Sequence, residues 1–434
     1  MLYIASKAIS FAFIYAFTLR AEHGLSATPD SLWQNRQFRI YLGSTGLSGI
    51  ATSMQQLLIT WLLVGILVLP AAQVGVIQAL IGLPGLILML FGGASADRAD
   101  PRTLLVRVYS TAWLFPIALL ALVRVDLLNI WSVSGFGVAM STAIFYSSPA
   151  QQAILNRIAG KDVQRAVTAA TAMTFIVQII GMGLAGQMER IGLDFVLFIQ
   201  AGSLALGALA VRMIAPIDTP SAARKGSTLE VIRQGFVAAY NNSTIFNTLI
   251  IVFISGIFNA GAFMTALPFI VKRAYDGDAI GFATIMVIFY GGATISNIIQ
   301  FWVMPLARPG FWFLVMQASR VVILFFVWIQ PSWWVLAAVM FAWGLNMGVT
   351  TNLSRAIVQE ASEPEFLARL LSVYSVGMAG SIPLGALVIG FIIEFFGEMN
   401  AMVPAMAVSV ALCLYGFTFT GLGRYRSPHV ADQA

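Results

Sequence analysis

Polar side chains inside long apolar runs are the residues of this chain that could do chemistry. Arg320 is the one charge deep within such a run, where it could pair with an anion or a carboxylate. A guanidinium at that depth is costly unless it lines a path or pairs neighbouring helices, so helix pairing is the alternative. Amides in other runs would offer hydrogen bonds without charge; these are Gln55, Gln56, Gln178, Asn259, Asn297, Gln300 and Asn346. Any single amide could equally form an interhelical hydrogen bond.

Residues for covalent, metal or nucleic-acid chemistry are lacking. Cys413 is the only cysteine, which excludes an intramolecular disulfide and a cysteine metal cluster. His23 and His429 lie in the terminal tails, and no Gly-rich nucleotide loop is present. The net charge of +6 is spread through short loops instead of forming a basic patch. We therefore expect no enzyme, no metal, no cofactor and no nucleic-acid partner.

The elements that must position these side chains are apolar runs long enough to cross a membrane. Residues are 59% hydrophobic and 10% charged, whereas about 25% is usual in soluble domains. A spanning helix needs about 20 apolar residues, and the runs lack the alternation of a β-barrel. The sequence predicts an all-α membrane protein with twelve spans, at 38–64, 73–95, 104–123, 128–149, 166–187, 194–214, 245–271, 280–304, 311–329, 333–353, 369–393 and 400–422.

Basic residues orient these spans. With the N-terminus in the cytoplasm, nineteen of the 24 Lys and Arg residues fall on that side and four on the other, with Arg320 inside a span. Such a bias follows the positive-inside rule, so both termini are predicted to be cytoplasmic.

The runs divide into two related halves. Ala153 to Asn156 resembles Ala356 to Gln359, and Glu189 and Gly192 match Glu394 and Gly397 at a similar offset of about 205 residues. A polar stretch separates the halves and ends in an amphipathic pattern. We expect an N-terminal extension at 1–34, six-helix bundles at 35–215 and 245–424, a cytoplasmic linker with an amphipathic helix at 216–244, and a tail at 425–434.

The loop after the second run carries a recognisable motif. It reads GGASADRADPR from Gly92 to Arg102. This resembles the signature loop of the major facilitator superfamily, a Gly followed by Asp-Arg and a further basic residue. The resemblance implies a gating network that holds helix ends together in one conformation, formed by Gly93, Asp97, Arg98 and Arg102. An ordinary short basic loop is the alternative.

Further stretches are similar to the drug and siderophore branch of that superfamily, the enterobactin exporter-like carriers. They are the residues at 35–39, 149–153, 180–186, 369–372 and 383–386. Two departures are present. Met182 follows Gly181 where exporters commonly have Pro, and the equivalent loop of the second half keeps Arg308 without an acidic residue.

The resemblance implies a monomeric secondary active transporter of the inner membrane, surrounded by lipid and working by alternating access. Export of a small amphipathic compound, of the drug or siderophore class, is the leading expectation. An uptake or lipid-flipping carrier of the same fold is one alternative, and a non-transporting membrane scaffold or sensor is another. The amides and Arg320 would then line the substrate cavity.

Coupling to protons would need a carboxylate that can be desolvated and titrated. No Asp or Glu lies in the middle of a span. Glu189 and Glu394 recur at the outer ends of the fifth and eleventh spans and are the coupling candidates, with an ordinary solvated helix end as the alternative.

Overall fold

The computed structural model describes residues 30–91, 100–215, 228–304 and 306–428, and all regular structure within these ranges is helical. Within these ranges, eleven helices are long and apolar enough to cross a membrane. A twelfth apolar helix, Met402–Thr418, is shorter, at 17 residues. The predicted all-α class and the twelve helices are therefore confirmed, although the last is short for a span.

The first half contains six long segments. They are α3 (Arg36–Trp61) with the π-helical turn η1 (Leu62–Ile66), α4 (Ala71–Phe91), α6 (Pro101–Ala112) continued by α7 (Leu114–Arg124), α8 (Ile130–Ala159), α9 (Val163–Gly186) and α11 (Leu193–Arg212). Short helices α2 (Asp30–Gln34), η2 (Gly160–Asp162) and α10 (Met188–Ile191) join them.

The second half contains six more. The seventh segment is broken into α13 (Ser243–Ser255), η3 (Gly256–Ala260), η4 (Ala262–Ala266), α14 (Leu267–Phe269) and η5 (Ile270–Ala274). It is followed by α15 (Ala279–Val303), α16 (Pro309–Trp328), α17 (Trp333–Glu360), α18 (Leu367–Phe396), α19 (Met402–Thr418) and the turn η6 (Leu422–Arg424). Helix α12 (Thr228–Asn241) precedes the half and packs against α18.

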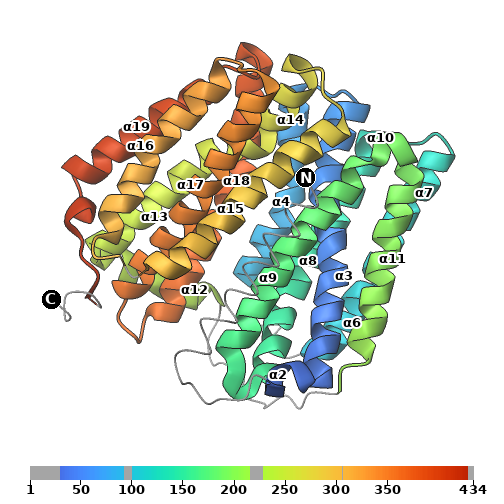
Figure 1. Ribbon diagram of the computed structural model, residues 1–434, viewed down its shortest axis with the longest axis horizontal. Helices are drawn as coiled ribbons and strands as arrows, with labels where there is room; N and C mark the ends of the chain where they lie inside the picture. The colour runs from blue at the N-terminus through green and yellow to red at the C-terminus, as the bar shows by residue number, and fades with distance from the viewer. Residues whose placement is uncertain (1–29, 92–99, 216–227, 305, 429–434) are drawn as a thin grey trace.

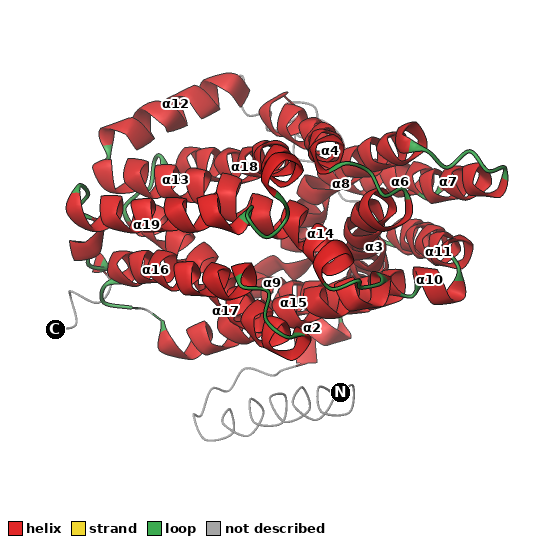
Figure 2. Ribbon diagram, turned by 90° about the horizontal axis from the view of Figure 1, so that it is seen from above, coloured by secondary structure: helices red, strands yellow, loops and turns green. Residues whose placement is uncertain are grey.

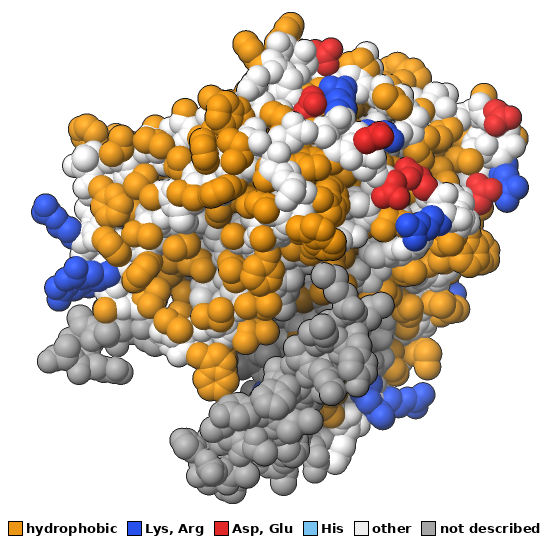
Figure 3. Space-filling view, turned by 45° about the horizontal axis from the view of Figure 1, so that its top comes forward, with side chains coloured by type: hydrophobic (Ala, Val, Ile, Leu, Met, Phe, Trp, Pro, Cys, Tyr) orange, Lys and Arg blue, Asp and Glu red, His pale blue; other side chains and the backbone are white. Residues whose placement is uncertain are grey.

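The helices run up and down between two ends of the molecule (Figure 1). We call the end where α3 begins and α19 ends the near end, and the opposite end the far end. Large apolar side chains cover much of the outer surface, whereas charged side chains lie toward the helix ends (Figure 3). This distribution matches a bundle whose sides face hydrocarbon.

The two halves lie side by side and meet along two helix pairs (Figure 2). Helix α4 packs against α18, and α9 packs against α15. Each pair joins the second long segment of one half to the fifth of the other, as expected for a duplicated six-helix unit.

Glycines allow the halves to approach closely. A Cβ on Gly75 of α4 would lie 2.5 Å from the carbonyl oxygen of Ala386 on α18. A Cβ on Gly186 of α9 would lie 2.4 Å from the Cβ of Ala283 on α15. Small residues at such positions are the usual means of close helix packing in membranes.

Two further glycines show the repeat in the backbone. Gly192 follows α10 with φ 89°, and its sequence counterpart Gly397 follows α18 with φ 86°. Both lie in the left-handed region, which favours glycine. The match at equivalent points supports the duplication inferred from sequence.

Candidate functional site

A cavity of about 510 Å³ lies in the first half of the molecule. Its walls come from α3, α4, α6, α8, α9 and α11, whereas the second half contributes only Met264, Ile382 and Ala386 to its described lining. Small-molecule sites commonly measure about 300–1,000 Å³. The cavity is thus large enough for a small organic solute.

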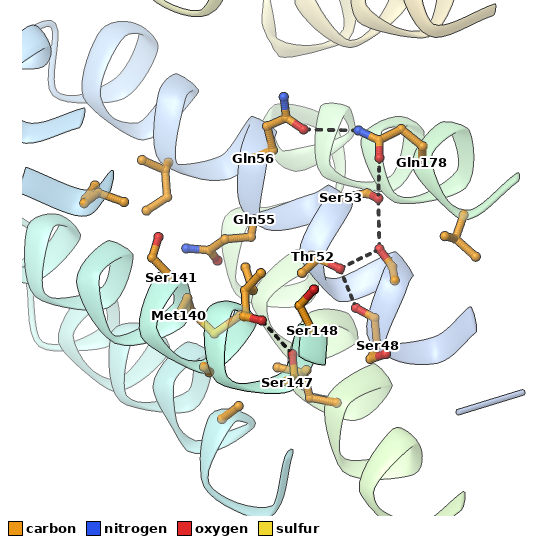
Figure 4. Close-up of a pocket in the computed structure, with 18 of the residues that line it drawn as sticks. Ser48, Thr52, Ser53, Gln55, Gln56, Met140, Ser141, Ser147, Ser148 and Gln178 are labelled. Atoms are coloured by element: carbon orange, nitrogen blue, oxygen red, sulfur yellow. Dashed lines mark hydrogen bonds between the residues drawn. The ribbon is translucent and has the colours of Figure 1, made fainter. Parts of the chain in front are cut away.

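Hydroxyl side chains form one face of α3 toward this cavity. Thr45, Ser48 and Thr52 are spaced by three and four residues, which places them on one side of a helix. Helix α8 faces them with Ser141, Ser148 and other polar residues (Figure 4). Several hydroxyls donate to a carbonyl one turn earlier, as Thr52 does to Ser48 at 2.7 Å. Their lone pairs remain able to accept hydrogen bonds.

Amides form the deeper part of the cavity. Gln56 Oε1 accepts a hydrogen bond from Gln178 Nε2 at 3.1 Å, and Ser53 donates to Gln178 Oε1 at 3.5 Å (Figure 4). Beside them, Gln55 Oε1 accepts from Gln200 Nε2 at 2.8 Å. The structure therefore brings together three of the predicted cavity residues, Gln55, Gln56 and Gln178.

Contacts between the halves close the space beyond the amides on the far side. Gln56 Nε2 donates to the Tyr290 hydroxyl at 3.0 Å, and Thr265 donates to Gln78 Oε1 at 3.0 Å. Further out, the rings of Trp61 and Phe282 stack with centroids 5.7 Å apart. We call these three cross-half contacts the far-side closure.

The two candidate coupling carboxylates lie at the far end. Glu394 of α18 accepts hydrogen bonds from the first N–H groups of α4, at 2.8 Å from Ala71 and 3.4 Å from Ala72. A carboxylate at a helix N-terminus satisfies free N–H groups and complements the helix dipole. Glu189 instead accepts from Trp61 Nε1 at 2.7 Å, and Lys272 lies 5.7 Å from the Trp61 ring centroid. Both carboxylates are exposed, and both lie next to residues through which the halves meet.

Arg320 lies outside the described cavity lining, in a buried polar cluster of the second half. Its guanidinium donates to Asn346 Oδ1 at 2.9 and 3.0 Å and to Gln317 Oε1 at 3.0 Å. It also donates to hydroxyls, at 2.5 Å to Ser255 and 3.2 Å to Thr350. These partners come from α13, α16 and α17, so the arrangement corresponds to the helix-pairing alternative.

The remaining amide candidates also lie in the second half and outside the described lining. Asn259 donates to Ser255 Oγ at 3.3 Å, within the Arg320 cluster. Asn297 accepts from Asn352 at 2.6 Å, and Gln300 donates to Ser296 Oγ at 3.0 Å. Each of these three makes a contact within the helical bundle.

The predicted gating loop is described only in part. Gly93, Asp97 and Arg98 lie outside the described residues, whereas Arg102 donates to the Arg212 carbonyl at the end of α11, at 2.7 Å. Asp100 caps α6 through the N–H of Thr103 at 2.9 Å. Burial alone would raise the pKa of Asp100, but hydrogen bonds from Thr103 and Arg102 lower it below its usual value.

Sequence reasoning missed several polar residues of the cavity. The missed lining residues include Ser48, Thr52, Ser141, Ser148 and Gln151. Their signal was available, because hydroxyl and amide residues recur every three or four positions in α3, and Ser141 and Ser148 lie seven positions, or two turns, apart on α8. Gln200, fully buried behind Gln55, was also missed.

Among the described residues, eleven spanning helices and one shorter apolar helix form two halves, with a solute-sized cavity in the first half. Together with the family match, they define a multi-pass membrane transporter of the major facilitator superfamily. Residues 27–424 match the family described as transmembrane secretion effector, and the chain belongs to that family. No curated protein matches the chain.

Solved structures share the fold. The nucleoside transporter NupG is 14% identical with a TM-score of 0.73, over 90% of this chain and 100% of that one. A bacterial homolog of the human lysosomal transporter Spinster, in an inward-facing and unoccupied conformation, is 14% identical with a TM-score of 0.68, over 90% and 97%. A D-xylose-proton symporter is 11% identical with a TM-score of 0.68, over 91% and 99%.

Proposed function

We propose that this transporter exports a small amphipathic compound across the inner membrane by alternating access, with the cavity of the first half as its substrate site. The observation that carries the proposal is a solute-sized cavity of mixed polar and apolar lining, bounded by a far-side closure made of contacts between the halves. Such a closure can open when the halves rotate relative to each other, because each of its contacts joins a residue of one half to a residue of the other.

The bundles at 35–215 and 245–424 are the moving bodies, and the linker at 216–244 joins them at the near end. Gly93, Asp97, Arg98 and Arg102 are the gating loop that holds the other side when the far-side closure opens. Glu189 and Glu394 are the candidate proton carriers, since each contacts a residue at the junction of the halves. The unit of transport is a monomer.

Uptake is the second candidate. The solved structures that share the fold include a nucleoside transporter and a D-xylose-proton symporter, whose named substrates are uncharged and rich in hydroxyls. The cavity of this chain also presents hydroxyls and amides, so the fold and the site fit uptake of a similar solute.

Transport in vesicles of both orientations separates the candidates. We expect energised inverted vesicles containing the protein to accumulate the uncharged amphipathic dye Nile red and radiolabelled uridine more than empty vesicles do. Asp97→Asn should reduce this accumulation at least about tenfold, because the gating loop acts through charge-assisted hydrogen bonds. Asp276→Asn, at an exposed far-end loop, is the matched control and should retain transport.

Accumulation only in right-side-out vesicles would show that the protein takes up its substrate and would overturn the export proposal. Absence of accumulation in either orientation, with the Asp97→Asn protein indistinguishable from wild type, would favour the scaffold alternative and overturn the proposal.

A further inference from the structure

One amide in the cavity has a donor without a partner. Gln55 is only 5% exposed, and its Nε2 atom is buried and makes no hydrogen bond to the described residues. Figure 4 shows this nitrogen on the side of Gln55 that faces Ser141, across the cavity from α3. A buried donor left unpaired is costly, so its retention at a lining position points to a ligand atom that completes it.

The orientation of Gln55 is determined by a backbone group. Gln200 Nε2 donates to the Ala51 carbonyl oxygen at 3.1 Å, and a carbonyl can only accept. The same Gln200 nitrogen donates to Gln55 Oε1 at 2.8 Å. The Gln55 oxygen is therefore held toward α11, and its NH₂ group must face the other way. Gln200 thus acts as a positioning residue for Gln55.

Three neighbouring amides donate to other protein groups. Gln56 Nε2 donates to Tyr290 of the second half, and Gln178 Nε2 donates to Gln56. Gln151 Nε2 donates to the Tyr109 hydroxyl. Gln55 therefore offers an amide donor that these contacts leave free for a solute.

Charge is absent from the described lining of the cavity. The lining consists of hydroxyl, amide, thioether, aromatic and aliphatic side chains and glycines. Arg320 donates only to neutral groups of its own cluster. An ion placed in such a cavity would lose its hydration without gaining a counter-charge, whereas a neutral oxygen would gain hydrogen bonds.

From these observations we infer that the cavity binds an uncharged solute, and that Gln55 Nε2, positioned by Gln200, donates to a carbonyl, hydroxyl or ether oxygen of that solute. The inference rests on the proposed transport function and specifies its substrate class. The first half then holds the solute, and the second half covers it with Met264, Ile382 and Ala386.

Alkylation of a cavity thiol tests the inference. Cys413→Ser removes the only native thiol, and Ser141→Cys then places a single reporter beside Gln55. The rate of alkylation by N-ethylmaleimide is measured on the purified protein with and without probes. Each probe pair consists of a neutral compound and its charged counterpart: uridine and uridine 5′-monophosphate, xylose and xylonate, nicotinamide and nicotinate. Ser148→Cys, at an exposed lining position, serves as a second reporter.

We expect at least one neutral probe to slow alkylation while its charged counterpart does not. Gln55→Leu and Gln200→Leu should each weaken that protection about tenfold, the effect of one lost hydrogen bond with an unpaired partner. Gln359→Leu, exposed on α17, should leave it unchanged. Because Gln200 acts through Gln55, the double variant should be no weaker than Gln55→Leu in protection, and the alkylation rate without probe should stay unchanged. Gln200→Leu should lower the melting temperature modestly, because it removes the donor to the buried Gln55 Oε1.

Three results would overturn the inference: equal protection by charged probes, protection unchanged in Gln55→Leu, or no protection by any neutral probe at a thiol that reacts. Accumulation of a charged probe in energised inverted vesicles would also overturn it while leaving the transport proposal intact. Failure to accumulate any solute in either vesicle orientation would instead overturn the transport proposal.

Discussion

At the scale of single residues, Arg320 shows how a buried cation can be kept without a described acidic partner. Its side chain is 5% exposed, and neutral oxygens accept its five hydrogen bonds. A planar guanidinium suits this arrangement, because its five N–H groups point in fixed directions. The sequence revealed the charge and its depth, but its partners come from three helices and could not be assigned before folding.

Replacing Arg320 should therefore destabilise the second half. Arg320→Met removes the donors and leaves the buried oxygens of Gln317 and Asn346 with only long hydroxyl contacts at 3.4 Å, at a cost of about 3 kcal/mol. Arg320→Lys keeps fewer donors than arginine, so its stability should fall between that of the wild type and that of Arg320→Met. Thermal unfolding in detergent measures the effect, and Arg190→Met at the exposed far end is the control. An unchanged or higher melting temperature for Arg320→Met would show that burial of the charge outweighs its hydrogen bonds.

At the scale of helices, the junction between α4 and α18 is the element pair most sensitive to side-chain size. Gly75 faces the backbone of Ala386 and Gly390, and Gly390 faces the backbone of Ala71 and Gly75 in return. The sequence placed both helices. It could not indicate which glycines meet, because the contact joins positions more than 300 residues apart.

Gly75→Ala should separate the halves at this junction. Its Cβ would lie 2.5 Å from a backbone oxygen that cannot rotate away, so we expect a loss of about 1–3 kcal/mol and lower transport. Gly291→Ala, on α15 with nothing within 4 Å, is the matched control and should gain up to about 1 kcal/mol. Melting temperature and vesicle transport check both variants. Equal melting temperatures and equal transport for Gly75→Ala and Gly291→Ala would contradict the conclusion that the α4–α18 junction is sensitive to side-chain size.

At the scale of the whole molecule, the charges still predict an orientation in the membrane. Among the described residues, arginines recur at the near end, whereas Arg124, Arg190, Lys272 and Arg273 lie at the far end. Three of the far-end cations contact acidic or aromatic groups there, as Arg124 does with Asp194 at 2.6 Å. The positive-inside rule then places the near end in the cytoplasm.

Thiol labelling in intact cells tests that orientation. On the Cys413→Ser background, Leu127→Cys at the far end should react with a membrane-impermeant maleimide from outside. Glu363→Cys at the near end should react only after the cells are permeabilised. The reverse labelling pattern would place the far end in the cytoplasm. It would then invert the predicted topology and the side on which the far-side closure lies.

The sequence by itself determined the helical class, the number of segments and the duplication, because these depend on local hydropathy and on repeated positions such as Gly192 and Gly397. Only the tertiary structure decided which polar residues share a cavity. It placed Gln55, Gln56 and Gln178 together in the first half and left Asn259, Asn297, Gln300, Arg320 and Asn346 in contacts of the second. The physical reason is rotation about the helix axis. A run of about twenty apolar residues specifies a helix, but which of its faces meets a cavity depends on neighbours far away in the chain.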